Sequence, residues 1–227
     1  MDKIQKMKYI IFDSGPIINF AMNGLLPLFR RLRKEFDGEF LITKEVKQEI
    51  IDTPLNIKKY ELEALQIKQL FDEGIIKHAN LTVQQIDALR IKREEIMNMA
   101  NTTFYAKNKP IHLIEKGESA ALALSLITKE PNLIAVDERT TRMLCENPEN
   151  LRKLLQKKLH VSITANKKNY EFFKQFKIIR STELAYIAYN KGLVDINDKR
   201  ALEALLYGLK FHGCSISEDE IEEAIIL

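Results

Sequence analysis

The chain has 227 residues, of which 45% are hydrophobic and 30% are charged, and its formal net charge is +3. This length suits one large domain, and the hydrophobic content excludes a disordered chain. The mildly basic balance is compatible with nucleic-acid binding but does not require it. No apolar run reaches the roughly 18 residues of a membrane span, and the start of the chain lacks a signal-peptide pattern. We therefore expect a cytoplasmic protein without a membrane partner.

The first predicted strand ends in an acidic residue. Residues 9–12 form a short apolar run, typical of a strand buried on both faces of a parallel sheet, and Asp13 follows directly. Ser14 and Gly15 supply a turn, and Pro16 suits the first turn of a helix. Asp13 thus lies at the carboxyl end of a central strand, where open α/β sheets bind ligands. A plain helix N-cap is the alternative role for this residue.

Strands and helices then alternate along the chain. We predict helices at 17–20 and 25–32, a strand at 39–42 and a helix at 44–52. Glu49 borders the buried side of the last of these helices. It is either a functional acid or an ordinary solvated charge.

Residues 55–110 are longer than a minimal α/β unit needs, and we predict a helical insertion there. An amphipathic helix occupies 55–73, a short strand follows at 75–79, and Thr82 caps a charged helix that runs to about residue 100. The first helix is expected to bury Leu62, Leu65, Leu70 and Phe71.

A second acid opens a buried helix. From Ala120 to Leu124 the side chains are small or apolar on every side, which is typical of a closely packed helix. Glu118 stands in the first turn, where the helix dipole by itself favours a carboxylate. Because burial makes that charge costly without a cation, we favour a functional role.

A third acid repeats the opening pattern. Residues 132–136 form an apolar strand that ends in Asp137, and a helix starts just after it. Asp137 is again either an N-cap or a functional group. Arg139 and Arg142 follow, as contacts to phosphate or as ordinary surface charge.

The last third of the chain is basic and mainly helical. We predict a helix at 151–159, a strand at 178–179, helices at 182–191 and 196–210, and a terminal helix that opens with a capping box at Ser217.

Lysines and aromatic residues alternate before that last strand. Lys153 and Lys157 face away from the apolar side of their helix, and Tyr170 and Phe172 follow. This pattern indicates either contact with RNA, with the rings stacked on unpaired bases, or a solvated surface over a core.

Together the acids define a geometry. Right-handed crossovers place the carboxyl ends of parallel strands along one edge, so we expect Asp13, Glu49, Glu118 and Asp137 to converge. Carboxylates in one place repel unless cations hold them, and an oxygen-rich site without His or Cys suits Mg²⁺ or Mn²⁺. The chemistry that follows is metal-assisted hydrolysis of a phosphodiester.

These residues resemble the PIN-domain ribonucleases. The resemblance rests on Asp13-Ser14, on Glu49, on the block from Gly117 to Leu124, and on Asp137 with the basic stretch that ends at Arg142. It implies a Rossmann-like α/β/α sandwich with a central parallel sheet, and a catalytic metal site made by the four acids with Ser14 in support. It also implies RNA cleavage, often by the toxin of a toxin–antitoxin pair, with RNA, an antitoxin-like protein and a second copy of the chain as partners.

The end of the chain resembles an archaeal and bacterial PIN subfamily with a C-terminal helical extension. We therefore expect a PIN-like domain over residues 1–180, with the insertion around 55–110, and an extension over 181–227 packed on it.

Two alternatives to a nuclease follow from the same residues. A haloacid-dehalogenase-like phosphatase also opens with a strand that ends in Asp, but it needs a second Asp where this chain has Gly15. A catalytically inactive PIN-like module for RNA binding or assembly stays open, because each acid taken alone has an ordinary structural explanation.

Overall fold

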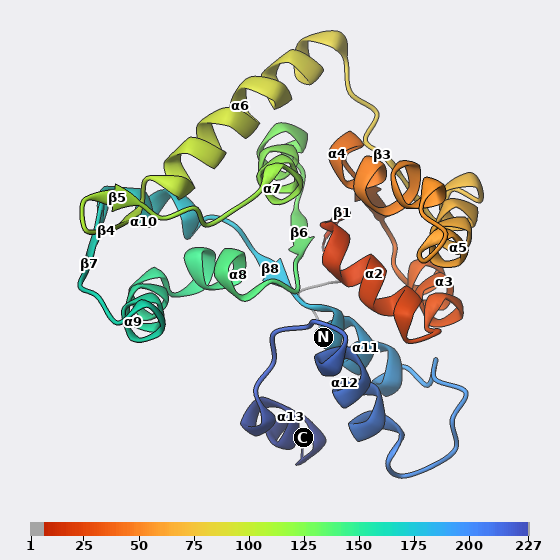
Figure 1. Cartoon of the computed structure of the whole chain (residues 1–227). Helices are drawn as coiled ribbons and strands as arrows, with labels where there is room; N and C mark the ends of the chain where they lie inside the picture. Colours follow the sequence, from red (N-terminus) through yellow and green to blue (C-terminus); the bar gives the residue numbers. More distant parts are fainter. Residues whose placement is uncertain (1–6, 227) are drawn as a thin grey trace.

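A five-stranded parallel sheet forms the centre of the molecule, in the order β3-β2-β1-β6-β8 (Figure 1). The computed structural model describes residues 7–226. Every neighbouring pair of strands in this sheet is parallel. The strand order reverses between β1 and β6, which is the position where open α/β sheets bind ligands. The strands are β1 (Tyr9–Phe12), β2 (Glu39–Ile42), β3 (Ile76–His78), β6 (Asn132–Ala135) and β8 (Ile178–Ile179).

Helices cover both faces of the sheet because its side chains alternate between two apolar cores. Ile10 and Phe12 of β1 point into one core, and Ile11 points into the other. The first core is covered by α2 (Ser14–Met22), α3 (Leu26–Glu35), α5 (Glu61–Asp72), α11 (Ser181–Asn190) and α12 (Ala201–Phe211). The second is covered by α6 (Val83–Asn101), α7 (Lys116–Thr128), α8 (Arg139–Glu146), α9 (Pro148–Leu159) and α10 (Lys168–Phe173). The predicted α/β fold with a central parallel sheet is confirmed.

A second, antiparallel sheet was not predicted. It has the order β5-β4-β7 and consists of β4 (Phe104–Ala106), β5 (Lys109–Pro110) and β7 (Ile163–Ala165). Lys107 and Asn108 join β4 to β5 with φ angles of 48° and 62°, the conformation of a tight hairpin turn. The stretch 55–110 is therefore not a purely helical insertion, since it also supplies this hairpin. The strand predicted at 75–79 is present as β3 of the central sheet.

Helix α5 presents a different face to the core from the one predicted. Ala64, Ile67 and Leu70 are buried, whereas Leu62 and Leu65 are 65% and 50% exposed. The prediction was wrong for these two leucines because apolar residues lie on more than one side of this helix, and periodicity alone does not show which side meets the sheet.

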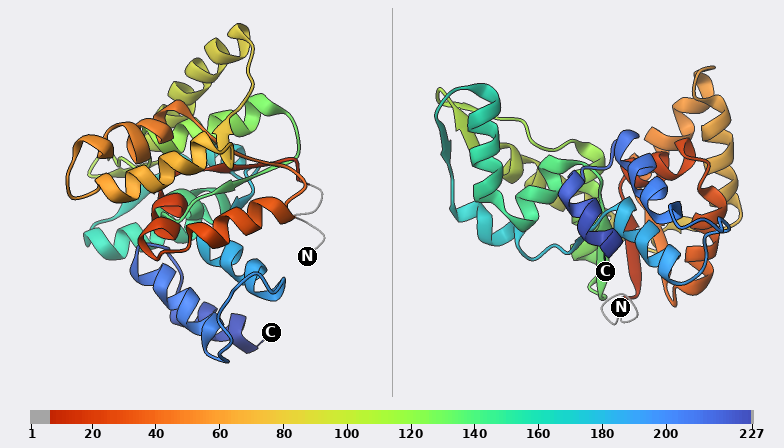
Figure 2. Two further views of the ribbon diagram at one scale, coloured as in Figure 1. Left: turned by 90° about the vertical axis from the view of Figure 1, so that its right-hand side faces the viewer. Right: turned by 90° about the horizontal axis from the view of Figure 1, so that it is seen from below.

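The predicted C-terminal extension packs on the central domain (Figures 1 and 2). Leu205 and Leu209 of α12 enter the core that contains α2. Arg180 binds α13 (Glu218–Ile226) through Glu220 at 2.9 Å, and donates to the Ser215 carbonyl at 3.1 Å. The predicted capping box at Ser217 is present, with hydrogen bonds of 2.8 and 3.1 Å to Glu220.

Between Met7 and Ile226, no helix combines the length and the apolar character needed to cross a membrane.

Candidate active site

Asp13 ends β1 at the point where the strand order reverses. Its backbone N–H donates to the Ala135 carbonyl at 3.0 Å, which joins the carboxyl ends of β1 and β6. Asp13 occupies the N-cap position of α2, yet its side chain makes no capping hydrogen bond. The residue is 5% exposed, and the hydrogen bond expected of a plain N-cap is missing.

The surroundings of Asp13 disfavour its charged form. Burial raises the pKa of Asp13 to about 8, the charge of Glu118 adds to this, and Glu49 contributes further. The backbone N–H groups of Ser14 and Gly15 act in the opposite direction without outweighing these effects. Asp13 is thus a buried carboxyl group that a nearby cation would stabilise in its ionised form.

Glu49 reaches the same place from a π-helical turn. The predicted helix over 44–52 divides into α4 (Lys44–Lys47) and the π-helical segment η1 (Gln48–Asp52). Such turns occur frequently at functional sites. A Cβ atom on Gly117 would lie 3.2 Å from Glu49 Oε2 and 3.4 Å from Asp13 Oδ1. The two carboxylates therefore approach one point beside α7, and Gly117 leaves room for them.

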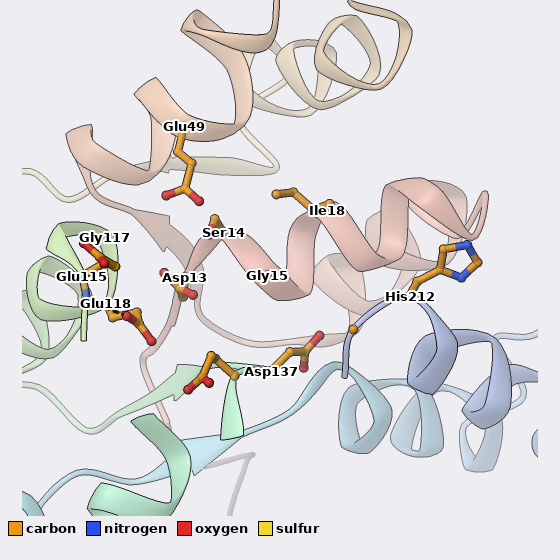
Figure 3. Close-up of a pocket in the computed structure, with 12 residues that line it drawn as sticks. Asp13, Ser14, Gly15, Ile18, Glu49, Glu115, Gly117, Glu118, Asp137 and His212 are labelled. Atoms are coloured by element: carbon orange, nitrogen blue, oxygen red, sulfur yellow. Dashed lines mark hydrogen bonds between the residues drawn. The ribbon is translucent and has the colours of Figure 1, made fainter. Parts of the chain in front are cut away.

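Glu118 is held by two hydrogen bonds. The Glu115 backbone N–H donates to Glu118 Oε2 at 2.7 Å within a capping box, and the Thr141 hydroxyl donates to Oε1. Burial raises the pKa of Glu118, and the bond from Thr141 opposes that effect. Glu118 therefore stabilises the start of α7, as one of its two predicted roles requires, and its side chain also faces Asp13 (Figure 3).

Asp137 is also fixed, but it does not cap the following helix. Glu138 caps α8 by accepting from the Thr141 N–H at 2.9 Å. Asp137 is 3% exposed and accepts from Asn19 Nδ2 at 3.0 Å and from the Ser181 N–H at 2.8 Å. Its carboxylate therefore connects the end of β6 to α2 and to the start of α11.

The four predicted acids line one cavity of about 320 Å³ (Figure 3). Helix α2 approaches closely here, since a Cβ on Gly15 would lie 3.6 Å from Asp137 Cβ. Within the described part of the chain, no lysine or arginine lines this cavity, so its field is negative. The remaining lining residues are Ser14, Gly15, Ile18, Glu115, Gly117, Glu138, His212 and Gly213.

The chemistry of these groups suits a divalent cation of the Mg²⁺ or Mn²⁺ type. The donors are carboxylate oxygens, which are the ligands that these ions prefer. Among residues 7–226, no three side chains of His, Cys, Asp or Glu lie close enough together to hold one metal ion. Asp13 and Glu49 approach each other at Gly117, so these two fit a cation best, while Glu118 and Asp137 are already hydrogen-bonded.

Sequence reasoning missed the residues that position the acids. Asn19 and Ser181 bind Asp137, and Thr141 binds Glu118. His212 lies at the end of the cavity away from Glu118 (Figure 3), with its Nδ1 hydrogen-bonded to the Gly208 carbonyl at 2.9 Å. Asn19, Ser181 and His212 carry no local motif, since the fold alone brings them to the site.

The two arginines predicted to contact phosphate have other partners. Arg139 Nε donates to the Ser215 hydroxyl at 2.9 Å. Arg142 binds Glu146 at 3.1 Å and reaches the Ser215 carbonyl at 3.4 Å. Both side chains thus hold the C-terminal segment against α8, and neither lines the cavity.

The other predicted RNA contacts divide into surface and core. Lys153 and Lys157 are exposed on α9, away from the lining of the cavity. Tyr170 is only 9% exposed, and Phe172 is half-buried against Phe173 and Phe176. Of the two alternatives for these rings, the burial favours the core beneath the lysines, because Tyr170 belongs to the second core and Phe172 packs against it.

Comparison of the chain with models of known protein families, with characterised proteins and with solved structures gives no match.

Proposed function

We propose that the protein is a divalent-metal-dependent ribonuclease that hydrolyses RNA phosphodiester bonds. The observation that carries this proposal is the convergence of Asp13, Glu49, Glu118 and Asp137 on one cavity, at the carboxyl edge of the sheet and beside its switch point. The PIN-like sequence motifs support the same reaction class. Ribonucleases of this kind also act as toxins with a paired antitoxin, and that role is part of the proposal.

In this proposal the acids have separate tasks. Asp13 and Glu49 would hold the cation, because they approach the same point beside Gly117. Asn19 and the Ser181 N–H fix the Asp137 carboxylate, and Thr141 fixes Glu118, so these two acids are oriented before RNA arrives. A bound divalent cation supplies an activated water and neutralises charge on the phosphate. Without positive charge, the acidic cavity repels a phosphodiester.

The direct test is cleavage of a pool of structured and unstructured RNAs with Mg²⁺, with Mn²⁺ or with EDTA. We expect cleavage with either ion and none in EDTA. Asp13→Asn and Glu49→Gln should each reduce the rate by roughly 100-fold or more, as loss of a key electrostatic group does. Glu223→Gln, on the exposed side of α13, is the matched control and should leave the rate unchanged.

A non-catalytic RNA-binding or assembly module is the second candidate, and one observation favours it. Glu118 and Asp137 already accept hydrogen bonds on both carboxylate oxygens, as purely structural acids do. This candidate is favoured if no RNA in the pool is cleaved with either ion while RNA binding persists in EDTA. Cation-dependent cleavage that is lost in Asp13→Asn excludes it.

A further inference from the structure

Basic side chains from two distant segments meet in one lobe of the molecule. We define the basic lobe as the β4–β5 hairpin, α9, β7 and α10. Antiparallel pairing of β4 with β7, with Tyr105 opposite Thr164, brings the hairpin beside the segment that follows α9. The lobe stands at one end of the molecule, opposite α3 and α5 (Figures 1 and 2).

The charge of the lobe is almost entirely positive. Between residues 149 and 177 the acidic residues are Glu149 and Glu171, and both are neutralised locally, by Arg152 at 2.8 Å and by Lys174 at 2.5 Å. The other lysines of the lobe are exposed and form no ion pair with any residue from 7 to 226. They are Lys107, Lys109, Lys153, Lys157, Lys158, Lys167 and Lys168. Since the whole chain carries +3, the rest of it is net negative.

Charge outweighs aromatic rings on the surface of the lobe, where Tyr105 is the ring of β4 that is half-buried and not fully covered. Tyr170 and Phe173 are buried beneath the lysines, and Phe172 is half-buried among neighbouring rings. Base stacking requires an accessible ring face. The chemistry that matches these lysines is a chain of regularly spaced anions, as in a nucleic-acid backbone.

A single helix, α8, connects the lining of the acidic cavity to the first helix of the lobe. Glu138 lines the cavity and caps the start of α8, and Asn147, at the end of α8, caps α9. The eight residues of α8 span about 12 Å. The start of α9 is therefore separated from the cavity lining by one short helix.

We propose that the basic lobe binds the phosphate backbone of RNA, independently of base sequence and of the acidic cavity. The choice of RNA as the polyanion rests on the proposed function, whereas the binding of phosphates rests on the lobe alone. The lysines of the β4–β5 hairpin belong to this surface only through the pairing of β4 with β7, so they distinguish the lobe from α9 acting alone.

The experiment is binding of a labelled single-stranded RNA in EDTA, which prevents metal-dependent cleavage, over a range of salt concentrations. One double variant is Lys107→Glu with Lys109→Glu, and the other is Lys153→Glu with Lys157→Glu. The control is Lys34→Glu with Lys199→Glu, which makes the same charge change at two exposed lysines outside the lobe. Thermal unfolding of each variant confirms that it is folded, and glutamine replaces glutamate in any variant that is not.

Both lobe variants should weaken binding by about 10-fold or more. Each should also lower the slope of log affinity against log salt by about 1.4, because two phosphate contacts to a single strand are lost. The control should bind within about 2-fold of the parent protein, as expected when surface charges touch no ligand. A hairpin variant with unchanged affinity and slope overturns the proposal, and so does a control that weakens binding as much as the lobe variants do.

A lipid surface is the rival polyanion, and vesicles containing phosphatidylglycerol test it. Lobe-dependent binding to vesicles without lobe-dependent binding to RNA overturns the proposal. Failure of the proposed nuclease function is visible separately, as absence of cleavage with Mg²⁺ or Mn²⁺ in a protein whose lobe-dependent RNA binding in EDTA is intact.

Discussion

Asp13 makes the stability of the metal-free protein depend on pH. In the unfolded chain this carboxyl ionises near its ordinary pKa of 3.8, whereas burial and Glu118 raise the pKa in the folded protein to about 8. Between these values the folded state holds a proton that the unfolded state has released. The contribution of protonated Asp13 to the free energy of unfolding is therefore fully present below about pH 4, and it is lost as the pH rises toward 8.

Asp13→Asn removes this dependence. A difference of even two pKa units corresponds to about 2.7 kcal/mol, or roughly 5 to 10 °C in Tm for a chain of this size. In EDTA the variant should thus melt several degrees above the parent protein at pH 8 and at the same temperature near pH 4. Asp37→Asn, at an exposed site, should show no such divergence. A lower Tm for Asp13→Asn at pH 8 would mean that the carboxylate holds the start of α2.

Asn19 joins three elements through one side chain. Its amide donates to Asp137, to Ser181 Oγ at 3.3 Å and to the Leu209 carbonyl at 3.0 Å, and the residue is 2% exposed. Asn19→Ala leaves buried acceptors without a donor and should lower the free energy of unfolding by roughly 1 to 3 kcal/mol in urea. Asn56→Ala removes an exposed bond to the Asp52 carbonyl and should cost less than about 0.5 kcal/mol.

The acids were predictable and their partners were not. Asp13 and Asp137 follow apolar strands, and Glu118 begins a helix, so each is marked by its neighbours in the sequence. Asn19 lies 118 residues from Asp137, and no sequence feature near either residue predicts their hydrogen bond. Arg139 was predicted to bind phosphate because its charge is visible in the sequence, whereas its bond to Ser215, 76 residues away, is not.

At the level of elements, runs of aliphatic residues decided which strands the sequence could predict. The inner strands β1, β2 and β6 each contain at least three consecutive apolar residues, and β3 and β8, although shorter, are marked by isoleucine pairs, so all five were predicted. The strands of the second sheet have only two or three residues and carry no such aliphatic run. Their pairing depends on bringing together segments far apart in the chain.

Arg180, which follows β8, attaches α13 and the segment around Ser215 to the end of the central sheet. Burial lowers the pKa of this guanidinium, but its bonds to Glu183 and Glu220 outweigh that effect and keep it charged. Arg180→Gln should destabilise the protein by roughly 1 to 3 kcal/mol, since the Ser215 carbonyl and Glu220 lose their donor. We also expect faster proteolysis between residues 211 and 217, read by mass spectrometry. Arg200→Gln, whose partner is the exposed Asp198, should behave as the parent protein does. Equal proteolysis of both variants would show that Arg180 is not the attachment.

At the scale of the whole molecule, cation binding in the acidic cavity should couple to global unfolding. An ion that binds only the folded state at 100 times its Kd stabilises it by about 2.7 kcal/mol, which raises the Tm by roughly 5 to 10 °C. Titration with Mn²⁺, followed by thermal unfolding, measures this rise.

The same Mn²⁺ titration distinguishes a variant of the cavity from a variant of the basic lobe. Glu49→Gln should abolish most of the Mn²⁺-dependent rise, because Glu49 approaches Asp13 beside Gly117. Lys153→Glu with Lys157→Glu should retain it, because neither lysine lines the cavity. A rise of equal size in Glu49→Gln would place the stabilising ion elsewhere.

The bond from Asn19 to the Leu209 carbonyl determines when the cavity can form during synthesis of the chain. It spans 190 residues, and the Ser215 N–H donates to the Asp137 carbonyl beside it. A ribosome delivers α2 before α12, so the acids of the cavity emerge before the segment that closes around them. The cavity is therefore assembled only after Ser215 has emerged from the ribosome.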